Sequence, residues 1–176
     1  MERFREHAPT DRCRPDPVDG IIGQWIRERP DLDVSPMAIL GRVSRAEKLL
    51  AERMKAASAR FGLERWGFDV LATLRRAGKP YRLTPTQLYG AMMLTSGAMT
   101  NRIDRLEEAG FVKRIEDPDD RRGTLVSLTT RGRKTIDAAV KVHMEVEKSI
   151  LYTFSAEERA SLERLLRILL NRLEES

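Results

Sequence analysis

The sequence predicts a mainly α-helical fold with one small β-hairpin, and three features of the chain support that prediction. Over most of the 176 residues, apolar side chains recur at the three- and four-residue spacing of amphipathic helices. Capping residues and glycines divide this pattern into separate helices. One stretch, residues 111–128, is instead rich in β-formers on both sides of a turn-rich centre, which is typical of a hairpin.

The composition is that of a basic soluble protein. Apolar residues make up 41% of the chain and charged residues 34%, and the formal net charge is +5. A positive surface attracts polyanions, although many basic proteins have no nucleic-acid partner. The single cysteine, Cys13, has no partner for an internal disulfide, and no apolar run reaches the ~18 residues of a membrane span. We therefore expect a cytoplasmic protein without a membrane partner.

The N-terminal part of the chain is expected to hold a mobile arm followed by helices. Residues 1–17 contain three prolines among charged side chains, a composition that neither buries apolar surface nor sustains a helix. After this arm, a short helix ends before a proline, and a long helix begins at the cap formed by Ser35 and Pro36. The expected helices span residues 18–29, 35–61 and 64–77.

Two short helices follow in tandem. Thr84 and Gln87 form a capping box around a proline at the first helical position, so a helix begins at residue 85 and ends near residue 92. Thr95 caps the next helix, which covers residues 96–109 and is ended by Gly110. Two short helices joined by a tight turn form a helix-turn-helix pattern.

The hairpin comes directly after this pair of helices. Segments 111–116 and 124–128 are rich in β-formers, and the residues between them include Asp117, Pro118 and Gly123, which favour a turn. A hairpin in this position is the wing of a winged helix-turn-helix.

The C-terminal part returns to helices. A helical stripe runs from residue 130 to residue 154, and Ser155 with Glu158 forms a second capping box. The last helix carries an unbroken leucine stripe that one small module has no surface to cover, so we expect an obligate homodimer. The stripe consists of Leu162, Leu165, Leu166, Leu169, Leu170 and Leu173.

The second helix of the tandem pair offers a polar face suited to DNA. Its apolar residues Ile103 and Leu106 cluster on one side, and Asn101 and Arg105 fall roughly opposite. Asparagine can pair with adenine, arginine can bind guanine or phosphate, and arginines at a hairpin tip can enter a minor groove. A solvated polar face and an ordinary charged turn are the alternatives for each element taken alone. The candidate DNA-binding residues are Ser96, Gly97, Ala98, Thr100, Asn101, Arg105, Arg121 and Arg122.

Residues 84–132 resemble the multiple-antibiotic-resistance regulator (MarR) family. The family pattern D-x-D-x-R-R corresponds to residues 117–122, and the pattern V-x-L-T-x-x-G corresponds to residues 126–132. The resemblance implies a ligand-controlled repressor of pseudo-palindromic duplex DNA, whose second helix enters the major groove and whose terminal helices interlock two subunits. The expected regions are an arm (1–17), N-terminal dimerisation helices beside a ligand pocket (18–62), the winged module (63–129) and C-terminal dimerisation helices (130–176).

A narrower likeness is to the urate-responsive PecS and HucR subgroup of this family, and it is carried by the additional N-terminal helix and by residues 25–33. The ligand positions of that subgroup correspond to Trp25, Asp69, Arg102 and Arg114, which implies a small anionic aromatic effector such as urate. Arg102 lies about 70° from the centre of the apolar helix face, where a charge needs a partner. A core tryptophan, a solvated aspartate and a β-edge arginine are the alternatives, and a phenol or another aromatic acid remains open as effector.

Enzymatic, metal-binding and redox functions find little support in the sequence. His7 and His143 have no metal-ligand spacing, and Cys13 lies in the expected arm without a neighbouring base. We read no phosphate-binding loop and no nucleophile–base pair, so we expect neither catalysis nor a cofactor. A winged-helix module that contacts only protein stays open as a rival, although such a face more often shows aromatic or aliphatic anchors.

Overall fold

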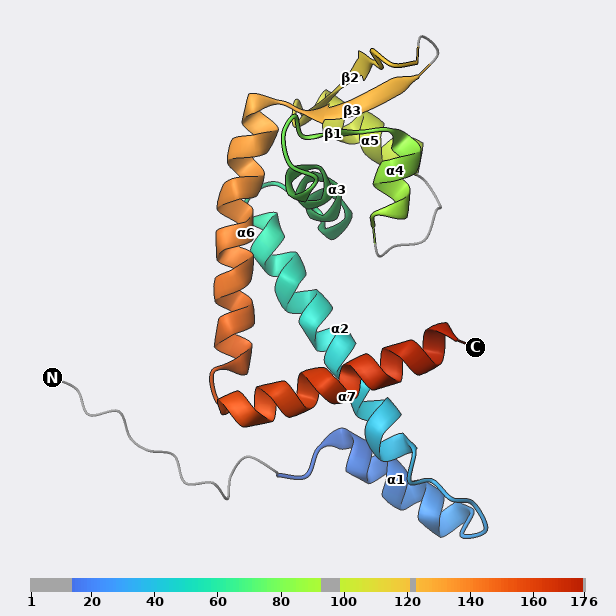
Figure 1. The fold of residues 1–176 in the computed structure, drawn as a ribbon. Coiled ribbons are helices and arrows are strands. Elements are labelled where there is room, and N and C mark those ends of the chain that lie inside the picture. Colours follow the sequence, from blue (N-terminus) through green and yellow to red (C-terminus); the bar gives the residue numbers. More distant parts are fainter. Residues whose placement is uncertain (1–13, 93–98, 121–122, 176) are drawn as a thin grey trace, which may run out of the picture. The chain divides into compact units, whose positions relative to one another are not determined.

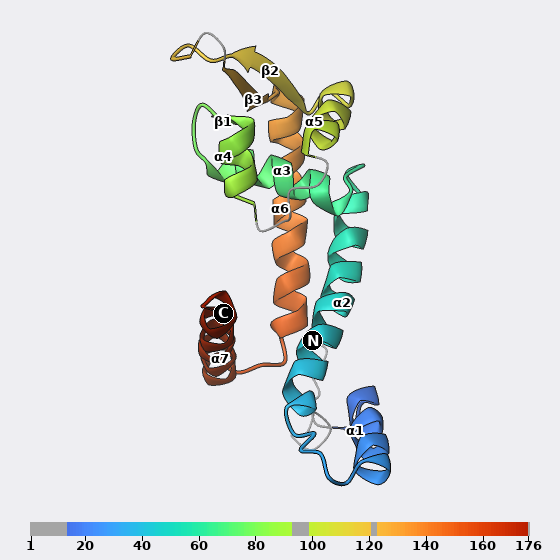
Figure 2. The ribbon, with the colours of Figure 1, turned by 90° about the vertical axis from the view of Figure 1, so that its right-hand side faces the viewer.

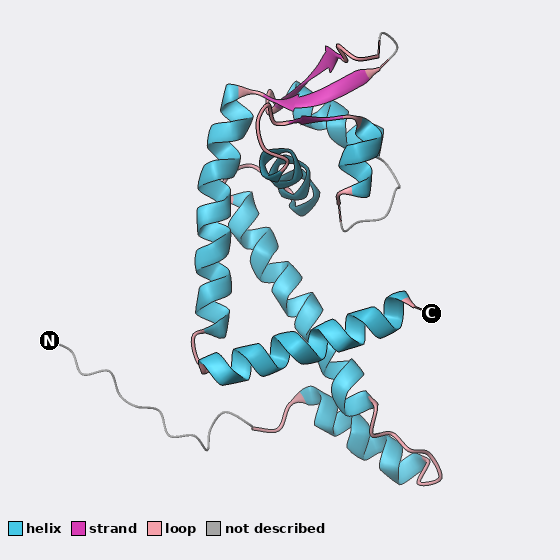
Figure 3. Cartoon of the chain, viewed as in Figure 1, coloured by secondary structure: helices cyan, strands magenta, loops and turns pink. Residues whose placement is uncertain are grey.

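The structure of the chain is a computed structural model that describes residues 14–92, 99–120 and 123–175. It is mainly helical, with one small sheet, as Figure 3 shows. The chain divides into two compact units, Met1–Glu52 and Arg53–Ser176, and the boundary falls inside a long helix. Among the described residues, no helix is long and apolar enough to cross a membrane.

The first unit is built from α1 (Pro17–Glu28) and the N-terminal part of α2 (Met37–Ala59). Asp16 and Asp19 form a capping box at the start of α1, so this helix begins inside the expected arm. Arg42 of α2 binds both carboxylates, at 2.8 Å to Asp16 and 2.5 Å to Asp19. Where Val18 packs on α2, a Cβ at Gly41 would lie 3.1 Å from its side chain, so glycine permits this close contact.

The second unit contains the expected helix-turn-helix. Its buried core draws on three helices, with Val70, Leu71 and Leu74 on the first and Leu88 and Ile103 on the following two. The capping box of Thr84 and Gln87 is confirmed, because each side chain bonds the other residue's backbone N–H at 3.0 Å. The three helices are α3 (Arg65–Arg76), α4 (Pro85–Gly90) and α5 (Met99–Glu108).

The wing is confirmed as a hairpin, and it belongs to a three-stranded antiparallel sheet. The strand order is β1-β3-β2, with β2 paired to β3 from Val112 opposite Leu128 to Glu116 opposite Thr124. The third strand, a two-residue strand beside β3, was not expected from the sequence. Figures 1 and 2 show the hairpin next to α5. The strands are β1 (Arg82–Leu83), β2 (Val112–Glu116) and β3 (Thr124–Leu128).

Two helices follow the sheet, α6 (Thr130–Leu151) and α7 (Ala156–Glu174). Thr129 caps α6, and the predicted capping box of Ser155 and Glu158 begins α7. Ile136 and Ala139 fix α6 to the core of the second unit. By contrast, α7 has no buried residue, and every leucine of its stripe except Leu169 is exposed within the described single chain.

α2 begins later in the chain than the sequence predicts. We expected Ser35 to cap this helix, whereas α2 begins at Met37 and the Asp33 carboxylate accepts a hydrogen bond from the Ser35 N–H at 2.9 Å. Asp33 thus forms the local turn, because an aspartate readily bonds the backbone two residues ahead.

Candidate DNA interface and ligand site

The helix α5 has one buried face and one exposed face, as the helical wheel predicts. Ile103 and Leu106 are buried, at 2% and 3% exposure, and pack into the core of the winged module. A Cβ at Gly67 of α3 would lie 3.5 Å from Leu106, so glycine lets α5 approach α3 closely. Thr100 and Asn101 are exposed, which leaves their side chains available to a partner.

Several of the candidate DNA-binding residues lie outside the described residues. They are Ser96, Gly97 and Ala98, which precede α5 in the sequence, and Arg121 and Arg122, which fall between β2 and β3 in the sequence. The described members of the set are Thr100, Asn101 and Arg105.

Arg105 does not extend freely from α5. Its guanidinium lies 5.0 Å from the centre of the Trp66 ring and donates a hydrogen bond to the Glu64 carboxylate at 2.7 Å. The Trp66 indole N–H donates to the same carboxylate at 2.8 Å. Arg102, one turn earlier on α5, also lies over Trp66, at 5.9 Å from the ring centre. One flank of α5 is therefore held on the start of α3.

The other flank of α5 is held by the wing. The guanidinium of Arg114, on β2, binds Asp104 at 2.5 Å and also forms a short contact with Glu107. The Arg114 backbone N–H donates to the Glu107 carboxylate at 2.7 Å. These bonds couple the position of the wing to that of α5.

Asp69 belongs to α3, and Arg102 lies on the flank of α5 that meets the start of α3. Burial raises the pKa of Asp69, against the opposing charges of Arg65, His143, Arg76 and Arg102. The Arg102 Nη1 atom is buried and has no hydrogen-bond partner among the described residues. Arg102 thus flanks the core, as the sequence predicts, and its guanidinium retains an unused donor.

His143 of α6 completes the surroundings of Asp69. Its ring stacks on Phe68, with 4.5 Å between ring centres, and its Nε2 atom lies 3.2 Å from Glu147. Among the predicted ligand residues of the second unit, Arg102 lies within electrostatic range of Asp69, whereas Arg114 binds Asp104 and Glu107. Trp25 lies on α1 of the first unit, where it is 41% exposed.

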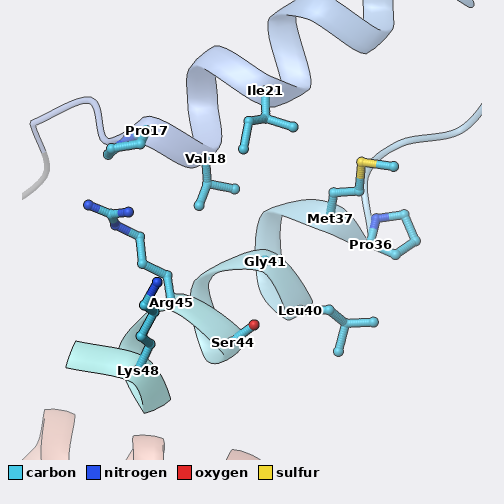
Figure 4. Close-up of a pocket in the computed structure, with 10 residues that line it drawn as sticks. All are labelled: Pro17, Val18, Ile21, Pro36, Met37, Leu40, Gly41, Ser44, Arg45 and Lys48. Carbon is cyan, nitrogen blue, oxygen red and sulfur yellow. The ribbon is translucent and has the colours of Figure 1, made fainter. Parts of the chain in front are cut away.

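Each unit also has a groove of its own. In the second unit, a groove of 420 Å³ lies between α4, α5 and the hairpin, and its walls include Tyr89, Thr100 and Arg114. In the first unit, a groove of 440 Å³ lies between α1 and α2. Figure 4 shows its apolar wall, to which Ile21 contributes, and the cationic Arg45 farther along α2.

Comparison with known proteins places this winged module in a family. The profile described as "MarR family" matches residues 65–124. The transcriptional regulator PecS of Dickeya dadantii is 42% identical over 149 residues, which span 85% of this chain and 90% of PecS. The chain belongs to the MarR family.

Other MarR-family proteins agree with this assignment. The multiple antibiotic resistance protein MarR of Escherichia coli is 35% identical over 101 residues, which span 57% of this chain and 68% of that protein. A mutant of the E. coli protein, solved in complex with operator DNA, has a TM-score of 0.67 at 29% identity and covers 79% of this chain and 99% of that one. A putative MarR-like regulator of Bacillus cereus has a TM-score of 0.71 at 25% identity, covering 80% and 99%. This MarR-family chain is therefore a DNA-binding transcription regulator and not an enzyme.

The residues that match the MarR-family pattern have identifiable structural roles. The Asp117 N–H donates to the Gly123 carbonyl at 3.1 Å and closes the base of the wing loop. A Cβ at Gly123 would lie 2.9 Å from the Cβ of Asp117, so the loop requires glycine there. The Thr129 hydroxyl accepts from the Gly132 N–H at 2.9 Å and donates to the Gly110 carbonyl at 2.8 Å, which joins the end of α5 to the start of α6.

Sequence reasoning missed four side chains that hold α5. Glu64 and Trp66 of the α3 flank were not singled out, and the pairing of Asp104 and Glu107 with Arg114 was not anticipated. One signal was available, since Glu64 and Trp66 are two residues apart at the start of a predicted helix. Their partner on α5 is 41 positions away from Glu64, so only the fold reveals the contact.

Proposed function

We propose that this MarR-family protein is a homodimeric repressor of pseudo-palindromic DNA, released by a small anionic aromatic ligand such as urate. The observation that carries the DNA-binding part is the exposed side of α5, where Thr100 and Asn101 point away from the buried Ile103 and Leu106. Hydroxyl and amide groups on an exposed recognition helix suit phosphate oxygens and the edge of adenine. The wing arginines, Arg121 and Arg122, supply the minor-groove contact in this proposal.

The dimer is supported by the exposed apolar faces of the terminal helices. Every leucine of the α7 stripe except Leu169 is among the exposed large apolar side chains, and Ile21, Ile26 and Leu40 of α1 and α2 are exposed as well. Exposed apolar stripes of this kind mark protein interfaces, and a twofold dimer would place two recognition helices about one DNA turn apart. We therefore assign α1, α2, α6 and α7 to dimerisation.

The ligand part is supported by the surroundings of Asp69. The Asp69 carboxylate, whose charged form is disfavoured by burial, lies within electrostatic range of Arg102, whose buried Nη1 has no hydrogen-bond partner among the described residues. A planar anion offers acceptors for such a donor and competes with Asp69 for the arginine. Because Arg102 belongs to α5, a movement of Arg102 would shift the helix that contacts the DNA and would lower the affinity for DNA. In this proposal Trp25 contributes an aromatic wall and Arg114 a second cation.

One titration tests this function. The protein is titrated onto the DNA upstream of its own gene and onto an unrelated duplex of equal length, at several salt concentrations, with and without urate. We expect tighter binding to the upstream DNA, affinity that falls steeply with salt, and weakening by urate. A salt slope near zero would overturn the DNA-binding proposal, and an unchanged affinity in urate would overturn the choice of ligand.

A further inference from the structure

Glu64 occupies the N-cap position of α3 but does not cap the helix. Its backbone has the extended conformation of a cap residue, and its side chain makes no capping hydrogen bond. Both carboxylate oxygens are used elsewhere: one accepts from the Trp66 indole N–H and the other from Arg105 of α5. An aspartate at an N-cap position ordinarily bonds the first backbone N–H groups of its helix. The Glu64 carboxylate is directed instead toward the recognition helix.

Trp66 completes this holding site for Arg105. The guanidinium lies 5.0 Å from the ring centre, within the range of a cation–π contact, while Glu64 neutralises its charge. The indole N–H fixes the carboxylate at 2.8 Å, so the ring positions both the anion and the cation. Arg105 is therefore bound to a carboxylate of its own chain at the place where the proposed DNA interface needs a free cation.

The ion pair between Arg105 and Glu64 is weak enough to form and break reversibly. The side chains of Arg105 and Glu64 are 55% and 57% exposed, so water and salt screen their attraction. Exposed ion pairs are weak, so this pair can be exchanged at low cost for a contact that arginine makes better elsewhere, such as the two hydrogen bonds it forms with the edge of guanine.

We propose that Glu64 is a positioning residue that holds Arg105 on Trp66 in the DNA-free protein and so lowers the affinity for DNA of any sequence. This inference depends on the proposed DNA-binding role of α5. On a duplex that offers only phosphates, Arg105 stays with Glu64 and displaces no counterion. Removal of the Glu64 charge frees Arg105 to bind a phosphate, which adds one released counterion to the binding reaction.

The test is a double-mutant cycle on a duplex of unrelated sequence. Four full-length proteins are compared: wild type, Glu64→Gln, Arg105→Ala and the double variant. We expect Glu64→Gln alone to strengthen binding about two- to five-fold, the range for loss of an exposed ion pair. We also expect it to steepen the log–log salt slope by about 0.9, which corresponds to one further phosphate contact.

The Arg105→Ala background is the matched control, because it keeps the general electrostatic effect of losing one negative charge and removes the held arginine. If Glu64→Gln changes affinity and slope by the same amount in both backgrounds, the inference is overturned. A steep slope for wild type with no effect of Glu64→Gln overturns the inference and leaves the proposed function standing. A wild-type slope near zero overturns both.

Discussion

Gly132, in the first turn of α6, lies directly against the backbone carbonyl of Phe111 at the start of the wing. A Cβ at Gly132 would fall 1.9 Å from the Phe111 oxygen, far closer than any two such atoms approach. The same carbonyl accepts a hydrogen bond from the Thr129 N–H at 3.0 Å. The Thr129 hydroxyl in turn accepts a hydrogen bond from the Gly132 N–H and so caps α6. The junction of α5, the wing and α6 therefore depends on the absence of a side chain at one position.

Gly132→Ala should consequently destabilise the winged module. Phe111 and Gly132 are both buried, so the added methyl group forces a shift of backbone and costs about 3 kcal/mol of unfolding free energy. Denaturant unfolding followed by circular dichroism measures this loss. Gly90→Ala is the matched control, because nothing lies within 4 Å of a Cβ at Gly90, and it should be neutral or slightly stabilising. Equal stability of the two variants would contradict the close contact.

Asn101→Ala should weaken binding to the operator and leave binding to unrelated DNA nearly unchanged. A base contact through the amide is worth roughly 1–3 kcal/mol of discrimination, which is about a 5- to 150-fold loss of operator affinity. Fluorescence anisotropy with both duplexes measures the difference. Asn171→Ala, an exposed asparagine on α7, is the control and should bind like wild type. Normal operator binding by Asn101→Ala would show that Asn101 makes no base contact.

The elements that sequence reasoning located well are those with local signals. The capping boxes at Thr84 and Ser155 depend on residues three positions apart, and both form as expected. The box of Asp16 and Asp19 carries the same kind of signal and was passed over, since the prolines around it favoured an arm. Residues 82–83 form a strand too short for any periodicity, and they pair with β3 only through the tertiary fold.

The candidate site was predictable in outline, but its contacts were not. A helical wheel places Arg102 beside the core and Arg105 away from it, and the observed exposures agree. A helical wheel does not predict which residues of other elements lie next to each flank of α5. Trp66 meets both arginines only because α3 and α5 cross closely, and Arg114 reaches Asp104 only because β2 runs back beside α5. Such partners are set by tertiary packing.

Leu166→Glu should dissociate the proposed dimer. Leu166 lies within the apolar stripe of α7 and is exposed in the single chain, so a charge there would have to be buried in a dimer interface. Sedimentation at micromolar concentration should show a dimer for wild type and a monomer for the variant. Arg164→Glu changes the opposite side of the same helix and should remain dimeric. A Leu166→Glu protein that stays dimeric would exclude the α7 stripe from the interface.

Asp69→Asn should stabilise the protein increasingly as pH rises. Burial raises the pKa of Asp69 above its ordinary value of 3.8, so the folded state holds this proton more tightly than the unfolded state does. Between pH 3.8 and the raised folded-state pKa, the contribution of Asp69 to stability therefore declines with increasing pH. Asparagine does not titrate, so its advantage in thermal unfolding should grow as the pH rises from 3.8 toward the folded-state pKa of Asp69 and should stay constant above it. A difference independent of pH would contradict the raised pKa.

Urate should weaken operator binding through the residues around α5. An anion near Asp69 competes for Arg102 of α5, and Arg114 holds the opposite flank of that helix through Asp104 and Glu107. A coupling of ~1–3 kcal/mol, typical of allostery, corresponds to roughly 5- to 150-fold lower operator affinity at saturating ligand.

The quantity to measure is the ratio of operator affinities without and with urate, because this ratio cancels any effect of a substitution on DNA binding itself. Wild type should show the full ratio, and Trp25→Ala or Arg114→Ala a much smaller one. Arg133→Ala, which removes an exposed cation of α6, is the control and should behave like wild type. If all four proteins gave the same ratio, urate would act at another site, whereas a ratio of one in wild type would point to a different effector, such as a phenol or another aromatic acid.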